Sequence, residues 1–239
     1  MIEREVTVTT AEGEMTTFVF HPEHEGPHPV VLYLMDAPSI RPALKDMASR
    51  LATAGYYVML PYLFYRGGPF REFGLTDEDM HARRELMGSI TPTNIVGDAE
   101  ALLAFAADDP AARDGKVGAV GFCMSGGLAV SLARALPERV AAAASIHGAW
   151  LVRDTPDSPH LGLDTVTAEI YFAWVDDDPT APPDTIPPMR EALDAAGVSY
   201  TLDFIPDALH GFAPAGERYN RYASELHWER VHSLLRRNL

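Results

Sequence analysis

The stretch that decides the fold is Gly121-Phe122-Cys123-Met124-Ser125-Gly126-Gly127. The mostly apolar residues 116–120 before it predict a buried strand, and residues 128–136 after it predict a helix. A nucleophile flanked by small residues, at a tight turn from a strand into a helix, is typical of a nucleophile elbow. Glycines let the strand and the helix approach closely there. Cys123 stands at the apex, where the N–H groups at the start of the helix favour a thiolate.

The elements around this turn follow an alternating order. Two β-branched runs with turn residues between them predict an opening hairpin. The predicted strands are residues 6–10, 15–20, 30–35, 56–61, 116–120, 142–148, 168–175 and 200–205. The predicted helices are residues 41–54, a charged helix of about fifteen residues from Thr76, 94–107, 128–136, 186–196 and 219–237. Strands that alternate with helices predict an α/β fold with a mostly parallel sheet and helices on both faces. We expect one domain over residues 1–239, with the aromatic residues 62–75 as a loop near the active site.

Composition limits the classes of partner. Net charge is −15, from 34 acidic and 19 basic side chains, which disfavours nucleic acid and anionic membranes. A single cysteine cannot form an intramolecular disulfide. We see neither a secretory signal nor a stretch of the ~20 apolar residues that a membrane helix needs, so we expect a cytoplasmic protein. No cluster has metal-ligand spacing, and we expect neither metal nor cofactor.

Histidines and aspartates further along the chain supply the other parts of a cysteine acylation mechanism. His210 follows the last predicted strand and is the expected base, with His147 at another strand end as its nearest competitor. Three consecutive carboxylates, Asp176-Asp177-Asp178, close the strand before it, and one of them would orient the imidazole. The order nucleophile, acid, histidine is that of the α/β-hydrolases. Three other histidines are expected in helices and exposed to solvent, namely His81, His227 and His232.

These motifs resemble the dienelactone hydrolase family, a branch of the α/β-hydrolases with a Cys-His-Asp triad. The resemblance rests on residues 121–127, 178–182 and 210–212 and extends to the order of elements over the whole chain. It implies Cys123 as nucleophile and His210, within His-Gly-Phe, as base. Members carry an aspartate at a strand end with a proline four residues later, which favours Asp178 over Asp176, with Asp177 last.

The oxyanion hole is expected to use two backbone N–H groups. One belongs to Met124, the residue after the nucleophile. The other would come from the loop after the first long parallel strand, where the resemblance favours Ala37; Pro38 has no N–H to donate. Asp36 stands where well-known members carry a glutamate that takes part in activating the thiol. The aspartate is one methylene shorter, so it either keeps that role or caps backbone N–H groups in its loop.

A second departure concerns the substrate. Where members carry an arginine that grips a substrate carboxylate, four residues after the catalytic histidine, this chain has Pro214. Five arginines are candidates to replace it, namely Arg66, Arg71, Arg83, Arg84 and Arg218. Ser125 is a rival nucleophile, but the elbow pattern would then require glycine at position 123.

The sequence therefore predicts a hydrolase that cleaves a small lactone or carboxylic ester through a cysteine acyl-enzyme. One alternative is a broad-specificity carboxylesterase or thioesterase. Another, from a different class, is a non-catalytic protein of the same fold with Cys123 as a redox-sensitive thiol. We expect a small-molecule substrate, no nucleic-acid or membrane partner, and a monomer or weak homodimer.

Overall fold

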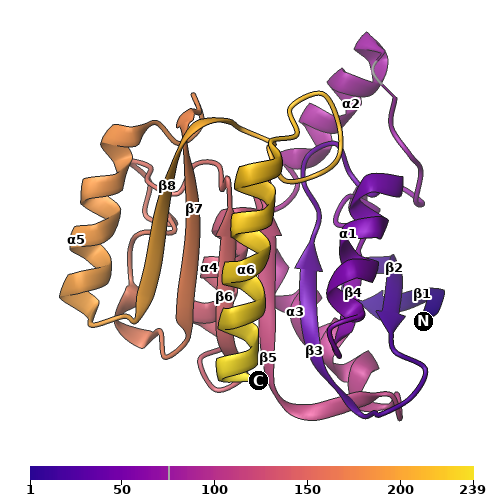
Figure 1. Cartoon of the computed structure of the whole chain (residues 1–239). Helices are drawn as coiled ribbons and strands as arrows, with labels where there is room; N and C mark the ends of the chain where they lie inside the picture. Colours follow the sequence, from indigo (N-terminus) through magenta and orange to yellow (C-terminus); the bar gives the residue numbers. More distant parts are fainter. Residues whose placement is uncertain (75) are drawn as a thin grey trace. The chain divides into compact units, whose positions relative to one another are not determined.

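The computed structural model describes residues 1–74 and 76–239. The chain forms two compact units, Met1–Gly115 and Lys116–Leu239. Figure 1 labels their helices and strands. Residue 75, the last residue of the expected aromatic loop, lies outside the described residues. Whether the two units behave as the single domain expected from the sequence stays a prediction.

The first unit opens with the predicted hairpin. Strands β1 (Ile2–Thr10) and β2 (Gly13–His21) pair antiparallel over their whole length. β2 then pairs antiparallel with β4 (Tyr57–Pro61), and β4 pairs in parallel with β3 (His28–Leu34). β4 is buried along its whole length and β3 nearly so, as expected of apolar strands covered on both faces. The strand order in this unit is β1-β2-β4-β3.

Three helices complete the first unit. α1 (Pro42–Ala52) packs on β4 and β2, and α3 (Asn94–Ala107) contacts β1. The bounds of α3 are those predicted from the sequence. The charged helix α2 (Asp77–Met87) is shorter than expected: the Thr76 side chain caps it by accepting from Asp79 N, and Gly88 ends it. A short turn, η1 (Tyr65–Gly67), precedes α2.

The second unit is a parallel sheet that positions the site. Its strands are β5 (Ala112–Phe122, which begins in the first unit), β6 (Val140–Ile146), β7 (Glu169–Asp177) and β8 (Tyr200–Leu209). They pair in parallel in the order β5-β6-β7-β8, so their carboxyl ends meet at one edge. β8 runs four residues beyond its predicted end, because it keeps pairing with β7 up to Leu209.

Helices cover both faces of this sheet. α4 (Gly126–Ala135) packs on β6 from one face, and α6 (Arg221–Asn238) crosses β6 and β7 on the other (Figure 1). α5 (Ile186–Ala196) has the predicted bounds and ends at Gly197, whose φ of 68° is the left-handed conformation that glycine adopts easily. Three short turns lie between these elements: η2 (Cys123–Ser125), η3 (Leu163–Thr165) and η4 (Pro183–Thr185). The predicted α/β class with mostly parallel strands is confirmed.

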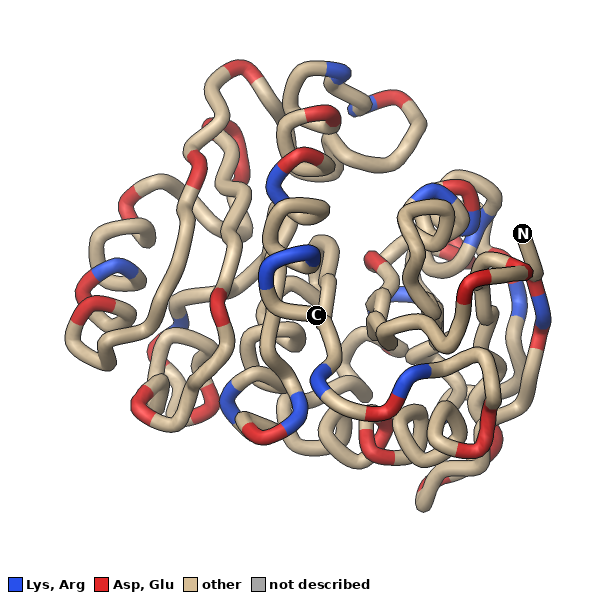
Figure 2. Tube along the Cα trace, turned by 60° about the horizontal axis from the view of Figure 1, so that its bottom comes forward, with Lys and Arg blue, Asp and Glu red and all other residues tan. Residues whose placement is uncertain are grey.

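Acidic residues are distributed along the elements of both units, as Figure 2 shows. This distribution agrees with the net charge of −15. Among residues 1–74 and 76–239, no helix combines the length and the apolar character needed to cross a membrane.

Candidate active site

Cys123 lies at the sharp turn between β5 and α4. Its φ is +54°, a left-handed value that costs a residue with a Cβ about 1–2 kcal/mol. The turn also needs glycine nearby, because a Cβ on Gly121 would lie 2.1 Å from the carbonyl oxygen of Ser125. The side chain of Cys123 is partly exposed. This is the geometry that the elbow motif predicts.

The turn is also fixed from the side of β6. A Cβ on Gly126 would lie 2.5 Å from Gly148 Cα, so the start of α4 and the loop after β6 touch through their backbones. In the same loop, Ala149 N donates to Cys123 O over 2.9 Å. The backbone of Cys123 is therefore held from two sides, which keeps the thiol at the carboxyl edge of the sheet.

The structure brings Asp178 and His210 together at this edge. His210, directly after β8, donates from Nδ1 to Asp178 Oδ2 over 2.6 Å. The Asp178 side chain is only 2% exposed, and the other oxygen, Oδ1, accepts from the N–H and the hydroxyl of Thr180. Asp176 and Asp177 are exposed. Of the three consecutive carboxylates, Asp178 is the one that contacts the imidazole.

These contacts decide the charge of both groups. Burial by itself lowers the pKa of His210, but hydrogen bonds to Asp178 and Cys123 outweigh it and raise the pKa to about 10. Burial pushes the pKa of Asp178 upward, while the bonds from His210 and Thr180 bring it below its ordinary value. At neutral pH the imidazole is thus protonated and Asp178 ionised. Because Nδ1 is taken by Asp178, the bond to Cys123 falls to Nε2.

Hydrogen bonds hold the loop that carries Asp178. Trp174 Nε1 donates to Ala181 O over 2.7 Å, and Ala181 N donates to Asp178 O over 3.2 Å. Thr180, which the sequence analysis did not single out, bonds Asp178 and also lies 3.4 Å from His210 Nδ1. An aspartate followed two residues later by threonine is a turn signal that could have pointed to it.

A group of aromatic rings and imidazoles surrounds His210. His147 packs edge to face on it, with ring centroids 5.0 Å apart, and also contacts Phe122 and Phe212. His147 is buried, and burial first, then the neighbouring His210, lowers its pKa well below the ordinary value. His147 is therefore neutral, unlike His210.

The expected exposure of His227 is wrong, because it is 0% exposed. It lies on the face of α6 that packs on the sheet and contacts Phe122 and Phe212. Its charged sequence neighbours, Glu225 and Glu229, lie on the exposed side of the helix. The residues next to His227 in sequence therefore lie on the opposite face of the helix and do not indicate how far His227 is buried.

Ser125 is engaged in the turn itself. Its hydroxyl accepts from Phe122 N over 2.9 Å and donates to Phe122 O over 3.0 Å, and the residue is fully buried. These bonds close the turn at the end of β5. The Ser125 hydroxyl therefore stabilises the turn, which makes Ser125 less suitable as a rival nucleophile.

Two further candidate residues, Asp36 and Ala37, belong to the first unit. Asp36 is buried and held by both terminal nitrogens of Arg41, at 2.6 and 2.9 Å. Its backbone O accepts from Ser39 N, so its loop is a tight turn after β3. The pairing with Arg41 is neither of the two roles expected for Asp36. The contribution of Ala37 N–H to an oxyanion hole stays a prediction.

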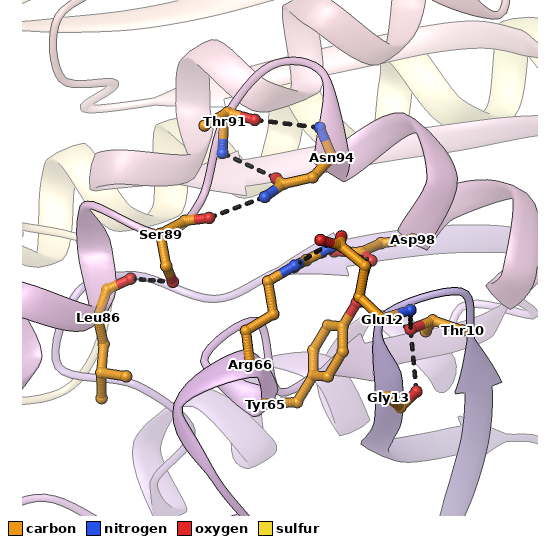
Figure 3. A network of polar contacts seen from close by, with 10 residues as sticks. All are labelled: Thr10, Glu12, Gly13, Tyr65, Arg66, Leu86, Ser89, Thr91, Asn94 and Asp98. Atoms are coloured by element: carbon orange, nitrogen blue, oxygen red, sulfur yellow. Dashed lines mark hydrogen bonds and ion pairs between the residues drawn. The ribbon is translucent and has the colours of Figure 1, made fainter.

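Two of the candidate arginines already have carboxylate partners. Figure 3 shows the Arg66 guanidinium directed toward the carboxylates of Asp98 and Glu12, and hydrogen bonds of 2.5–3.0 Å join it to both. Arg71 pairs with Asp79 at 3.0 Å. A cavity of about 460 Å³ lies beside them in the first unit, lined among others by Tyr62, Arg66, Phe70, Arg71 and Glu85. Both arginines are thus largely neutralised by their own unit.

The other three candidates differ in their surroundings. Arg83 and Arg84 lie on α2 in the first unit. Arg218 lies in the second unit, and its Nη1 donates to His210 O over 3.3 Å. In the part of the chain that the structure describes, no three His, Cys, Asp or Glu side chains gather so as to hold a metal ion.

The sequence profile of the dienelactone hydrolase family matches residues 15–239. The chain belongs to this family. A relative from Synechocystis sp., named "Putative carboxymethylenebutenolidase", is 28% identical over 98% of this chain and 96% of its own length. A "Carboxymethylenebutenolidase" from Pseudomonas sp. is 32% identical over 45% of each chain.

Solved structures of dienelactone hydrolases share the fold. A "Putative Dienelactone Hydrolase" from Klebsiella pneumoniae covers 98% of this chain, and the chain covers 97% of it, with a TM-score of 0.86 at 22% identity. The dienelactone hydrolase from Anabaena variabilis matches all of this chain, and 98% of its own, with a TM-score of 0.72 at 21% identity. The expected α/β-hydrolase fold is thereby confirmed, and the chain is a hydrolase of the dienelactone hydrolase type.

Proposed function

We propose that this hydrolase cleaves a small carboxylic ester or lactone through an acyl-enzyme on Cys123. His210 carries the proton, and Asp178 holds the imidazole in place. The observation that supports the proposal is the position of His210, bonded to Asp178 at 2.6 Å on one side and to the Cys123 side chain on the other. Family membership supports the reaction class, and the Pseudomonas relative is named for a butenolide, which is an unsaturated lactone.

Acylation begins from a thiolate paired with an imidazolium. The Cys123 sulfur attacks the carbonyl carbon and forms a C–S bond, and the carbonyl oxygen becomes an oxyanion. Backbone N–H groups of Met124 and, by the resemblance, Ala37 stabilise this charge. The C–O bond then breaks, and His210 gives its Nε2 proton to the departing alkoxide. In a lactone, this alkoxide stays attached to the acyl group.

Deacylation reverses the proton flow. His210, now neutral, takes a proton from water while the water oxygen attacks the thioester carbonyl. The C–S bond breaks, the carboxylic acid leaves, and the thiolate–imidazolium pair is restored. Asp178 stays ionised throughout and stabilises the imidazolium each time it forms. The cycle consumes one water and needs no further reactant.

The decisive experiment follows 4-nitrophenyl acetate by absorbance and by intact mass. We expect a transient mass increase of one acetyl group on Cys123 and complete loss of turnover in Cys123→Ala. Ser131→Ala, which removes a buried hydroxyl bonded to Gly127 O on α4, is the matched control and is expected to stay active. Turnover that persists in Cys123→Ala would refute the mechanism.

The substrate class is tested with a panel of lactones and aryl esters, each with and without a carboxylate. Pro214 cannot form the charged contact that an arginine offers, so neutral substrates are expected to be preferred. Arg218→Ala tests the arginine that contacts the His210 backbone. A preference for the carboxylated compounds that disappears in Arg218→Ala would instead assign the carboxylate contact to Arg218.

A further inference from the structure

Trp150 turns a large apolar side chain toward solvent between two buried residues. It is 44% exposed, whereas Ala149 is 3% and Leu151 2% exposed. The other tryptophans of the chain, Trp174 and Trp228, are buried in the second unit. A backbone φ of +53° accompanies this arrangement. Exposed apolar side chains are common singly, so the position of Trp150 decides whether it matters.

That position lies between the nucleophile and the acid. The preceding N–H, of Ala149, donates to Cys123 O over 2.9 Å. The N–H of Trp150 itself donates to Thr180 O over 2.9 Å, and the Thr180 hydroxyl bonds Asp178. Two consecutive backbone bonds therefore tie Trp150 to the turn of Cys123 and to the loop of Asp178.

The backbone conformation at Trp150 indicates that the indole has a function. A left-handed φ is unfavourable for a bulky residue and persists only where surrounding contacts fix it, as the two bonds do here. Glycine would adopt the same turn without strain. The chain instead holds an indole there, at the carboxyl edge of the sheet where ligands of such folds bind.

We propose that the indole of Trp150 forms a subsite for a flat apolar group of the substrate, such as an aryl ring, beside Cys123. This inference rests on the proposed function, because it places the subsite next to the reacting carbonyl. An indole offers a broad π-face and little charge, so it recognises planar unsaturated groups by stacking. Trp150 thus selects aryl or conjugated esters over small aliphatic ones.

The first test compares Trp150→Ala and Trp150→Phe with wild type on phenyl acetate, methyl phenylacetate and ethyl acetate. We expect kcat/KM for at least one aryl ester to fall about fivefold in Trp150→Ala. Ethyl acetate is expected to change less than about twofold, and Trp150→Phe to recover part of the loss. Ratios to wild type remove the different intrinsic reactivities of the esters.

Phe204→Ala is the matched control for this comparison. Phe204 is also an aromatic residue with 44% exposure, but it lies on β8 before the catalytic loop. It is expected to leave all three ratios unchanged. Equal losses for aryl and aliphatic esters in Trp150→Ala, or no loss at all, would overturn the proposal.

A binding measurement separates this subsite from the proposed chemistry. In Cys123→Ala, 4-nitrobenzyl alcohol is titrated while tryptophan fluorescence is recorded with inner-filter correction. We expect saturable quenching that disappears in Cys123→Ala/Trp150→Phe. Saturable quenching without any Cys123-dependent hydrolysis in wild type would refute the proposed function and keep the subsite. Quenching that never saturates would refute the subsite and leave the hydrolysis untouched.

Discussion

His147 packs edge to face against His210, with ring centroids 5.0 Å apart and an angle of 65° between the ring planes. Both follow parallel strands, so the carboxyl edge of the sheet brings them together. Only His210 bonds a carboxylate, whereas neither ring nitrogen of His147 has a hydrogen-bond partner among the described residues. Each of these histidines directly follows a strand, yet their charges differ. Burial keeps His147 neutral, and Asp178 keeps His210 protonated.

The contact predicts that His147 acts through its ring and not through its nitrogens. His147→Phe keeps the packing against His210, so kcat/KM is expected to stay within about threefold of wild type. Removing two unpaired buried nitrogens is expected to raise the free energy of unfolding by about 1 kcal/mol. His147→Ala leaves a cavity and is expected to lower it by about 2–4 kcal/mol. Denaturant unfolding and ester kinetics measure both effects.

A different outcome would revive the rival base. If His147→Phe abolished turnover while a variant of His210 kept it, the roles assigned to the two imidazoles would have to be exchanged. The comparison is direct because both variants leave Asp178 and Cys123 in place.

Asp178 is predicted to be the only one of the three consecutive aspartates that matters for turnover. Asp178→Asn keeps the shape of the side chain but removes the charge that holds the His210 imidazolium, so kcat is expected to fall by at least about 100-fold. Asp176→Asn and Asp177→Asn are matched controls, because both side chains are exposed at the end of β7. Losses of similar size in all three variants would show that the acidic loop acts as a whole.

The elements that the sequence predicted well are those with local signals. Residues 94–107 and 186–196 carry helical spacing with clear ends, and both helices have the predicted bounds. The turn at Cys123 follows from small residues and from the strand and helix around it, which lie within a few residues in sequence. The local sequence pattern also predicted the start of α2 at Thr76 correctly, but the predicted helix was too long.

What the sequence missed depends on residues far apart in the chain. His227 has charged sequence neighbours, yet it is buried because the same helix presents its other face to Phe122 and Phe212. Asp178 could be favoured over Asp176 only through the family pattern, since the imidazole that it contacts lies 32 residues later. The pairing of Asp36 with Arg41 was missed for a different reason: the two residues are close in sequence, and the conformation of the loop between them decides the contact. The catalytic roles of these residues stay predictions.

The pH dependence of stability is predicted from the raised pKa of His210. The folded value is about 10 against an ordinary 6.5, so the folded state binds an extra proton between these values. The stability contributed by His210 is therefore complete below about pH 6.5 and is lost as pH rises through about 10. We expect the difference in unfolding free energy between wild type and His210→Gln to shrink steadily over this range.

Asp178→Asn is the control for this pH series. It removes one of the two partners that raise the pKa of His210, so the decline is expected to be smaller and to end at a lower pH than in wild type. Asp178 itself contributes to stability at acidic pH. Its pKa is lowered in the folded state, so its contribution to the unfolding free energy is present above about pH 4 and is lost as pH falls through the folded pKa. Urea unfolding between pH 3 and 10.5 tests both the acidic and the alkaline prediction. If the difference in unfolding free energy between wild type and His210→Gln did not change with pH, the ion pair would be contradicted.

The sharp turn at Cys123 is predicted to require glycine at position 121. A Cβ there would lie 2.1 Å from the Ser125 carbonyl oxygen, so the backbones on the two sides of the turn would have to move apart. Gly121→Ala is expected to lower the free energy of unfolding by about 2–3 kcal/mol and to slow iodoacetamide labelling of Cys123.

Gly97→Ala is the matched control, because Gly97 lies inside α3 with open space around its Cβ position. It is expected to raise the free energy of unfolding by about 1 kcal/mol, so the two substitutions have opposite signs. Equal effects at the two positions would mean that the close approach at the turn does not constrain the thiol.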